Sequence, residues 1–221
     1  MPSAPEKIGL SEVDTYLFDY GGVVSFHYCE PWQGNLSKLL GVSPKRVREL
    51  LSESSDQGRN YRTGAISRDE FWTIVMSLAS AKGVDIHELE DNWARSYQID
   101  HRMLRIIDFL RQTGNQVGVV MNTDEYRHSH IEQEYRISEI VDAVISSCEQ
   151  GCVKPQREAY LGALRIMNRE RAPHKTVYFD DRLRNIEPCL ELGMKGMVFE
   201  DFEQFQKQLI AEAILPLDHN D

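Results

Sequence analysis

The sequence predicts an α/β fold, a doubly wound parallel sheet, with a small all-helical block inserted after its first strand. The first observation is an apolar run that begins at Thr15 and stops at Asp19, directly before a tyrosine and two glycines. A buried parallel strand ends in this way at the carboxyl edge of a sheet. The second observation is the alternation of strand and helix patterns after residue 100, and the third is a purely helical pattern over residues 26–99.

The first strand is predicted over about residues 15–20, behind a polar lead-in of residues 1–11. Ligands of open α/β sheets bind at the carboxyl edge, so Asp19 is the candidate for the reacting group. The simpler interpretation is an aspartate that only starts a turn before Gly21 and Gly22. That interpretation loses weight because the same pattern, an apolar run stopped by a carboxylate, returns near residue 180.

The helical block carries two clear helix starts. Ser43 precedes a proline in the first turn, and Ser67-Arg68-Asp69-Glu70 has the spacing of a capping box. A further helix is expected over about residues 85–97, and no strand is expected in the block. The predicted domains are an α/β core and a helical cap over the end of the first strand, residues 1–25 with 100–221 and residues 26–99.

The rest of the chain alternates strand and helix, which implies right-handed crossovers and helices on both faces of the sheet. Asp100, Pro155 and Asp201 mark helix starts, and Gly114 and Gly193 mark helix ends. The expected elements are helix 100–113, strand 116–121, helix 125–136, strand 141–146, helix 155–168, strand 176–179, a helix ending at 192, strand 196–199 and a helix over about 201–213.

Composition narrows the function classes. The chain has 221 residues and a net charge of −10, so nucleic acid and anionic membranes are not expected partners. No apolar run approaches the roughly 20 residues of a membrane span, and the first fourteen residues lack a signal-peptide core. The cysteines form no CxxC pair, which suits a reducing compartment: they are Cys29, Cys148, Cys152 and Cys189. We expect a cytoplasmic monomer or homodimer without a zinc site.

Four predicted strand ends bring polar groups to one edge of the sheet. They are Asp19, Asn122 with Thr123, Lys154 and Asp180 with Asp181. Carboxylates that converge from separate strands repel one another unless a cation lies between them, and such oxygen ligands suit Mg²⁺. An aspartate beside Mg²⁺ and a lysine can attack phosphorus and form an aspartyl phosphate.

The same segments resemble the motifs of the haloacid dehalogenase (HAD) superfamily. Phe18-Asp19-Tyr20-Gly21-Gly22-Val23 is similar to its first motif, Gly151-Cys152-Val153-Lys154-Pro155 to its lysine motif, and the run from Tyr178 to Asn185 to its acidic motif in DDxxxN form. Val119–Thr123 occupies the second motif. The helical block resembles a C1-type cap, in which stretches like Tyr61–Ser67 are common. The resemblance covers about residues 13–205 and implies a Rossmann-like core.

The resemblance also implies roles for single residues. Asp19 would be the nucleophile, and Lys154 would steady Asp19 and the phosphoryl oxygens, with Asn122 and Thr123 nearby. Mg²⁺ would be held by Asp19, the Gly21 carbonyl and Asp181, with Asp180 or Asn185 acting directly or through water. The implied activity is Mg²⁺-dependent hydrolysis of a small phosphorylated molecule.

Two positions depart from the family pattern. Gly21 stands where the phosphatases usually carry a general acid, whose loss costs on the order of 10²–10⁴ in rate. Met121 stands where Ser or Thr is usual, and a thioether cannot donate a hydrogen bond to phosphate. We therefore expect a slow phosphatase, or one specialised for good leaving groups such as sugar 1-phosphates. The alternatives are a weakened phosphate- or partner-binding protein, and a 2-haloacid dehalogenase.

Several further residues can be interpreted either as structural or as functional. His27 is either a hinge residue or a replacement acid, and Asp124 is either a helix N-cap or an acid. The tryptophans Trp32, Trp72 and Trp93 are expected in the cap core rather than at a ligand. The stretch from Arg59 to Arg62 lies either on the substrate side of the cap or at a solvated helix end.

Overall fold

The computed structural model describes residues 9–27 and 33–216 of the chain. Its centre is a five-stranded parallel sheet with strand order β5-β4-β1-β6-β7. The strands are β1 (Thr15–Asp19), β4 (Gln116–Met121), β5 (Ala143–Ser146), β6 (Thr176–Asp180) and β7 (Lys195–Val198). The predicted α/β fold with a parallel sheet is confirmed.

The register of the three central strands sets the site. Asp19 at the end of β1 pairs with Val120 of β4, and Phe18 pairs with Phe179 of β6. All five residues of β1 are buried, as the near-continuous apolar run predicted. The ends of β1, β4 and β6 therefore lie side by side at one edge of the sheet.

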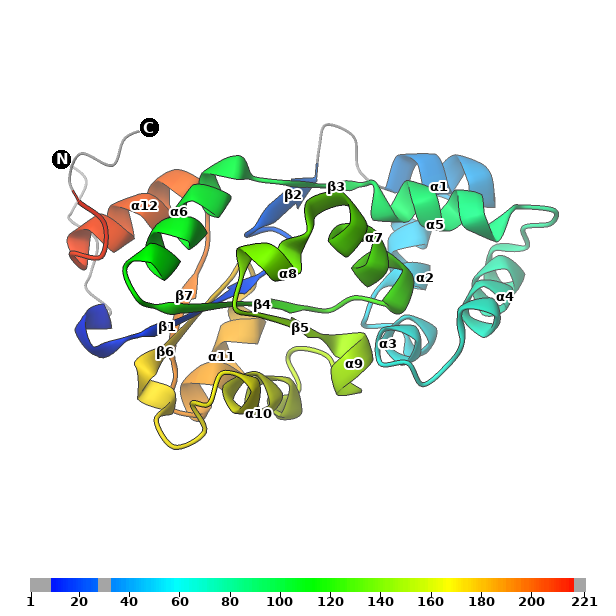
Figure 1. The fold of residues 1–221 in the computed structure, drawn as a ribbon. Coiled ribbons are helices and arrows are strands. Elements are labelled where there is room, and N and C mark those ends of the chain that lie inside the picture. Colours follow the sequence, from blue (N-terminus) through cyan, green and yellow to red (C-terminus); the bar gives the residue numbers. More distant parts are fainter. Residues whose placement is uncertain (1–8, 28–32, 217–221) are drawn as a thin grey trace.

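Helices cover both faces of the sheet (Figure 1). Side chains alternate along β1, so Tyr16 and Phe18 join one apolar cluster and Leu17 joins the other. The first cluster includes residues of η1 (Leu10–Glu12), α6 (His101–Gln112), α7 (Glu125–Tyr135), α8 (Ile137–Ile140) and α12 (Phe202–Ala211). The second includes residues of α10 (Arg157–Ile166) and α11 (Leu183–Glu191), while the short α9 (Ser147–Gln150) follows β5 directly. The predicted N-caps Asp100 and Asp201 each accept a hydrogen bond from the first turn of their helix.

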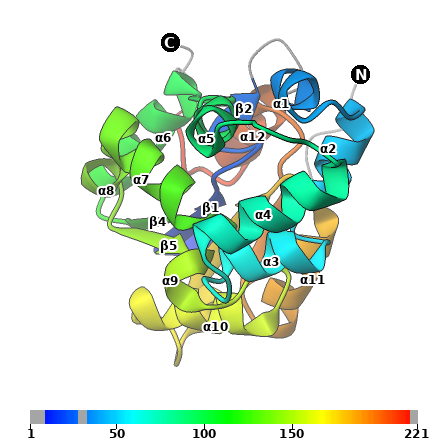
Figure 2. The same cartoon turned by 90° about the vertical axis from the view of Figure 1, so that its right-hand side faces the viewer.

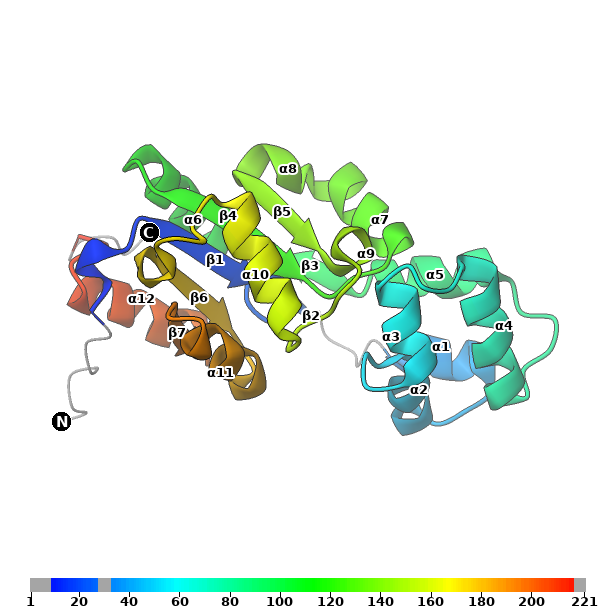
Figure 3. The same cartoon turned by 90° about the horizontal axis from the view of Figure 1, so that it is seen from below.

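The helical insert follows β1 and has its own apolar core, which contains Trp72 and Trp93 as predicted. Figures 2 and 3 show this insert beside the carboxyl end of the sheet. Ser43 caps its second helix, and Ser67 with Glu70 forms the predicted capping box. The helices are α1 (Gln33–Leu40), α2 (Pro44–Leu51), α3 (Asp56–Arg62), α4 (Arg68–Ala79) and α5 (Ile86–Ala94).

The prediction that residues 26–99 contain no strand is wrong. β2 (Ser25–His27) and β3 (Tyr97–Ile99) form an antiparallel ribbon where the chain leaves and re-enters the core. Strands of three residues are too short to produce a readable alternation, and the whole insert separates these two strands in the sequence. Because β3 begins at Tyr97, α5 ends at Ala94 rather than near residue 97 as predicted.

Some predictions fall on positions that the structure does not describe. Cys29 and Trp32 lie outside the described residues, and so does the side chain of His27. The division into core and cap at residues 25 and 100 stays a prediction. Within residues 9–27 and 33–216, no helix combines the length and apolar character needed to cross a bilayer.

Candidate active site

Three carboxylates converge at the carboxyl edge of the sheet. One oxygen each from Asp19, Asp180 and Asp181 lies within 4.8 Å of the other two. Asp19 ends β1 and Asp180 ends β6, so the pairing of these two strands brings the acids together. The convergence expected from the sequence is thus present in the structure.

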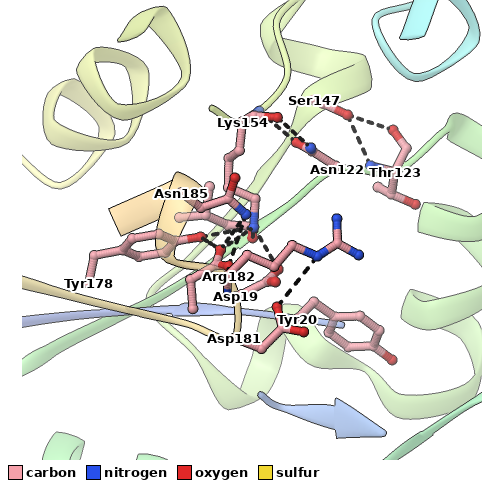
Figure 4. A network of polar contacts seen from close by, with 12 residues as sticks. Asp19, Tyr20, Asn122, Thr123, Ser147, Lys154, Tyr178, Asp181, Arg182 and Asn185 are labelled. Carbon is pink, nitrogen blue, oxygen red and sulfur yellow. Dashed lines mark hydrogen bonds and ion pairs between the residues drawn. The ribbon is translucent and has the colours of Figure 1, made fainter. Parts of the chain in front are cut away.

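Lys154 is the cation nearest to these acids. Its residue is only 2% exposed, and its Nζ lies 2.6 Å from Oδ1 of Asp19 and 3.3 Å from Oδ2 of Asp180. The same ammonium contacts the carbonyl of Val120 at 2.8 Å and the hydroxyl of Tyr178 at 2.9 Å (Figure 4). An ammonium has three protons, so its capacity is fully used by these four acceptors.

Asp180 is surrounded by donors. Its Oδ2 accepts a hydrogen bond from the Tyr178 hydroxyl at 2.5 Å, and its Oδ1 accepts from the backbone N–H of Arg182 at 3.0 Å. The Asn185 amide donates to both oxygens, at 2.9 and 3.0 Å. Asp181, in contrast, is only partly buried, with 35% of its side chain exposed. Of the two neighbouring acids, Asp181 is therefore the one open to a ligand.

The acids are electrostatically crowded. Burial raises the pKa of Asp19 to about 7, the charge of Lys154 lowers it, and the charges of Asp180 and Asp181 raise it. Burial also raises the pKa of Asp181, against the opposing effect of Arg182. In addition, the buried Oδ1 of Asn185 has no hydrogen-bond partner among the described residues. Oxygen ligands with excess negative charge and one unused acceptor fit a hard divalent cation.

Asn122 and Thr123 follow β4 beside Lys154, and their polar groups form hydrogen bonds within the protein. The Asn122 side chain donates to the Lys154 carbonyl at 2.9 Å and accepts from the Lys154 N–H at 2.8 Å. The N–H of Thr123 donates to the hydroxyl of Ser147 at 2.9 Å. Asn122 thus holds the lysine loop in place, using one of the two N–H donors of its amide.

Two glycines allow the loop after β1 to pack closely against its neighbours. A Cβ on Gly22, whose φ is +103°, would lie 2.8 Å from Oδ2 of Asp181. A Cβ on Gly21 would lie 3.3 Å from Cε1 of Tyr97 in β3. The aromatic ring of Tyr97 therefore covers the side of Gly21 on which a larger residue would place its side chain.

A cavity of about 90 Å³ opens onto Asp19, Lys154 and Met121. On the insert side it is lined by Glu53 and Arg62, and on the core side by Arg127 and Arg182. Glu53 binds across the boundary, because its Oε1 accepts from Arg182 at 2.7 Å and from Arg184 at 2.6 Å. Burial disfavours the Glu53 carboxylate, but the charges of Arg62, Arg182 and Arg184 and a backbone hydrogen bond lower its pKa to about 2.

The remaining candidates separate clearly. Asp124 is the N-cap of α7, since its Oδ1 accepts from the N–H of Arg127 at 3.0 Å, and its side chain is buried. Cys148 and Cys152 are free thiols of intermediate exposure and do not belong to the acidic cluster. Arg62 lines the cavity, whereas Arg59 is exposed and pairs with Asp56 on the same helix.

Sequence reasoning gave no role to Tyr178, which it placed only within the acidic motif, and it did not single out Ser147, Arg127 or Glu53. Tyr178 stands two residues before Asp180 on the same face of β6, and this period-two spacing was a usable signal. Glu53 reaches the cavity from the insert and Arg127 from α7, while Ser147 contacts the carbonyls of Arg62 and Thr123, so their places depend on how segments distant in the sequence pack together. No local pattern in the sequence reports that packing.

The sequence model of haloacid dehalogenase-like hydrolases matches residues 13–193. A sesquiterpene phosphatase of Aspergillus oryzae is 22% identical over 84% of this chain and 89% of its own length. Flavin mononucleotide hydrolase 1 of Arabidopsis thaliana, a chloroplastic protein, is 32% identical over 36% of this chain. The match spans only 31% of the length of the Arabidopsis enzyme.

Solved structures share the fold over nearly their whole length. A HAD family enzyme from Bacteroides thetaiotaomicron, in complex with magnesium and inorganic phosphate, superposes with a TM-score of 0.73 at 20% identity, covering 87% of this chain and 98% of that one. A predicted HAD-like hydrolase from Porphyromonas gingivalis also gives 0.73 at 20% identity, covering 90% and 98%. At such identities the likeness establishes the fold.

Proposed function

This chain belongs to the family of haloacid dehalogenase-like hydrolases, and on that premise we propose that it is a Mg²⁺-dependent phosphatase of a small phosphomonoester. The observation that carries the proposal is the position of Lys154, whose Nζ lies 2.6 Å from Asp19 inside the cluster of Asp19, Asp180 and Asp181. The phosphatase among the relatives and the magnesium and phosphate in the Bacteroides enzyme support it.

In the proposed reaction, an oxygen of Asp19 attacks phosphorus and the bond from phosphorus to the leaving oxygen breaks. Water then attacks the aspartyl phosphate, releases inorganic phosphate and restores the Asp19 carboxylate. Lys154 favours the ionised form of Asp19 against the effect of burial, and it compensates charge on the phosphoryl oxygens. Asn122 acts one step away, because it fixes the backbone that carries Lys154.

The residues that would hold Mg²⁺ are Asp19, Asp181 and the carbonyl of Gly21, with Asn185 beside them. Asp180 has its oxygens occupied by Tyr178, Arg182 and Asn185, so we assign it to positioning these groups or to contact through water. When bound, Mg²⁺ offsets charge on the transferred phosphoryl group and orients it.

The leaving group must depart without an acid at position 21. We therefore propose a preference for good leaving groups, such as aryl phosphates or sugar 1-phosphates, over simple alkyl phosphates. The cavity of about 90 Å³ is well below the roughly 300–1,000 Å³ of pockets for drug-sized ligands, so the enclosed part of the substrate is small. The helical insert would act as a C1-type cap that excludes water.

Two other functions remain as alternatives. Gly21 and Met121 favour a protein that binds phosphate or a partner without turnover. A 2-haloacid dehalogenase, in which Asp19 attacks carbon, is disfavoured because that reaction gains nothing from a crowded acidic doublet. Chloride release from a haloacid in the absence of Mg²⁺ would support the dehalogenase.

The test is a panel of phosphorylated metabolites, assayed with and without Mg²⁺. Asp19→Asn serves as the blank, and Asp14→Asn, a partly exposed acid that precedes β1 and pairs with Arg169 away from the cavity, as the matched control. We expect Mg²⁺-dependent phosphate release by the wild type and the control, and none by the blank. Equal phosphate release by the blank and the wild type would refute the assignment.

A further inference from the structure

Two arginines line the cavity that opens onto Asp19, and the hydrolysis described above uses neither of them. Arg62 comes from the last turn of α3 in the insert, and Arg127 comes from the first turn of α7 in the core. Their residues are only 5% and 6% exposed. Two guanidinium groups are thus enclosed in the cavity where the substrate would react.

Neither arginine is fully satisfied within the protein. The Nε of Arg62 and the Nη2 of Arg127 are buried and have no hydrogen-bond partner in the described part of the chain. Buried N–H groups of a charged side chain are costly to leave unpaired. Unused donors on two side chains in one cavity indicate a missing acceptor.

Charge is also unbalanced at this place. Arg127 pairs with Asp124 at 2.6 Å, whereas Arg62 forms no ion pair within 4.0 Å among residues 9–27 and 33–216. Both guanidinium groups lie over Trp93, with Cζ at 5.2 Å for Arg62 and 4.0 Å for Arg127 from the ring centroid. Burial and, after it, the neighbouring charge of Arg127 lower the pKa of Arg62 to about 10, against the opposing charges of Glu53 and Asp124.

The protein holds both arginines in place. The hydroxyl of Ser147 lies 2.8 Å from the carbonyl of Arg62 and 2.9 Å from that of Thr123, which ties the end of α3 to the core. Asp124 holds the Nε of Arg127. Fixed, dehydrated guanidinium donors are suited to binding an oxyanion, because little entropy is lost when the ligand arrives.

We propose that Arg62 and Arg127 form a second anion subsite, and that the preferred substrates are small phosphomonoesters with a further oxyanion, a carboxylate or a second phosphate, a few atoms from the reacting phosphoryl group. The assignment of the reacting end rests on the proposed function. The small volume of the cavity and the two unused donors narrow the proposed class: short phosphomonoesters whose leaving group itself carries a second anionic group.

The test measures binding of phosphonates that the protein cannot hydrolyse, by calorimetry at equal free Mg²⁺. Propylphosphonate is compared with 3-phosphonopropionate and with propane-1,3-bisphosphonate, which add a carboxylate or a second phosphonate to the same chain. We expect one or both doubly anionic probes to bind wild type about ten- to a hundredfold more tightly than propylphosphonate, as for hydrogen bonds to charged groups. Whichever probe gains more identifies the second group.

Variants then locate the effect. Arg62→Gln and Arg127→Gln should reduce the gain below about threefold, and Arg62→Lys, which keeps the charge without the planar fork, should retain part of it. The matched control is Arg59→Gln, one turn earlier on α3, with 40% of its side chain exposed and outside the cavity lining, which should retain the whole gain. The proposal is overturned if wild type shows no gain for either probe, or if the gain is equal in wild type and both glutamine variants.

These outcomes are independent of turnover. A protein that shows the binding gain but releases no phosphate in the metabolite panel keeps the subsite and loses the phosphatase assignment. A protein that releases phosphate but shows no gain keeps the phosphatase assignment and loses the subsite.

Discussion

The ring of Tyr97 lies directly against Gly21: the Cβ that this glycine lacks would be 3.3 Å from Cε1 and 3.9 Å from Cζ of the tyrosine. Such a contact is tight, so the tyrosine must move slightly for any larger residue at position 21. The absence of an acid after Asp19 is therefore coupled to a residue of the cap boundary.

This relationship predicts that restoring the acid requires two substitutions. Gly21→Asp alone should give little gain on a simple alkyl phosphate, because Tyr97 restricts the new carboxyl group. Gly21→Asp with Tyr97→Ala should exceed Tyr97→Ala alone by at least about tenfold, since a fully effective general acid contributes about 10²–10⁴. The measurement is kcat/KM for the alkyl phosphate. A full gain from Gly21→Asp alone would contradict the coupling.

Tyr178 is predicted to hold the ammonium group of Lys154 in position. Its hydroxyl touches both Lys154 and Asp180, at 2.9 and 2.5 Å. Tyr178→Phe should lower kcat by about tenfold, the equivalent of roughly 1.4 kcal/mol, while the affinity for phosphate changes little. The control is Tyr16→Phe, a buried tyrosine in β1 whose hydroxyl is outside the site. Equal losses in the two variants would assign Tyr178 a purely structural role.

The sequence was sufficient for the sheet and for the groups at its edge. Asp19, Lys154 and Asp180 each end or follow an apolar run, and the geometry of a parallel sheet brings such positions together. The ribbon containing Tyr97 could not be predicted, because strands of three residues leave no periodic pattern. The interaction of Glu53 with Arg182 was also invisible, because it depends on how the insert packs on the core.

Glu53 is predicted to stabilise the closed insert in a pH-dependent way. The pKa of Glu53 is lowered in the folded protein to about 2, from 4.5 for the free side chain. A carboxyl group with a lowered pKa stabilises the fold above its unfolded pKa, and this contribution is lost as the pH falls from about 4.5 to about 2. The contribution at neutral pH is at most about 3 kcal/mol.

The measurement is the free energy of unfolding of wild type and Glu53→Gln against pH. The difference between them should be largest near pH 7 and shrink below about pH 4.5. Glu49→Gln removes an exposed carboxylate that pairs with Arg46 on α2. This variant should leave the free energy of unfolding within about 0.5 kcal/mol of wild type. A constant difference between wild type and Glu53→Gln down to pH 2 would disprove the linkage.

Crowding in the acidic cluster predicts that Asp181→Asn raises the stability of the metal-free protein and weakens its stabilisation by Mg²⁺. Burial raises the pKa of Asp181, so its charged form is less stable in the folded protein than in the unfolded chain. The asparagine removes this penalty and should raise the free energy of unfolding of the metal-free protein. Mg²⁺ at about 100 times its Kd should stabilise wild type by about 2.7 kcal/mol, and the variant much less. Asp108→Asn, an exposed acid on α6, is the control for general effects of charge. If thermal unfolding shows that Mg²⁺ stabilises wild type and Asp181→Asn equally, Asp181 does not hold the cation, and the ligand set must be sought elsewhere at this edge of the sheet.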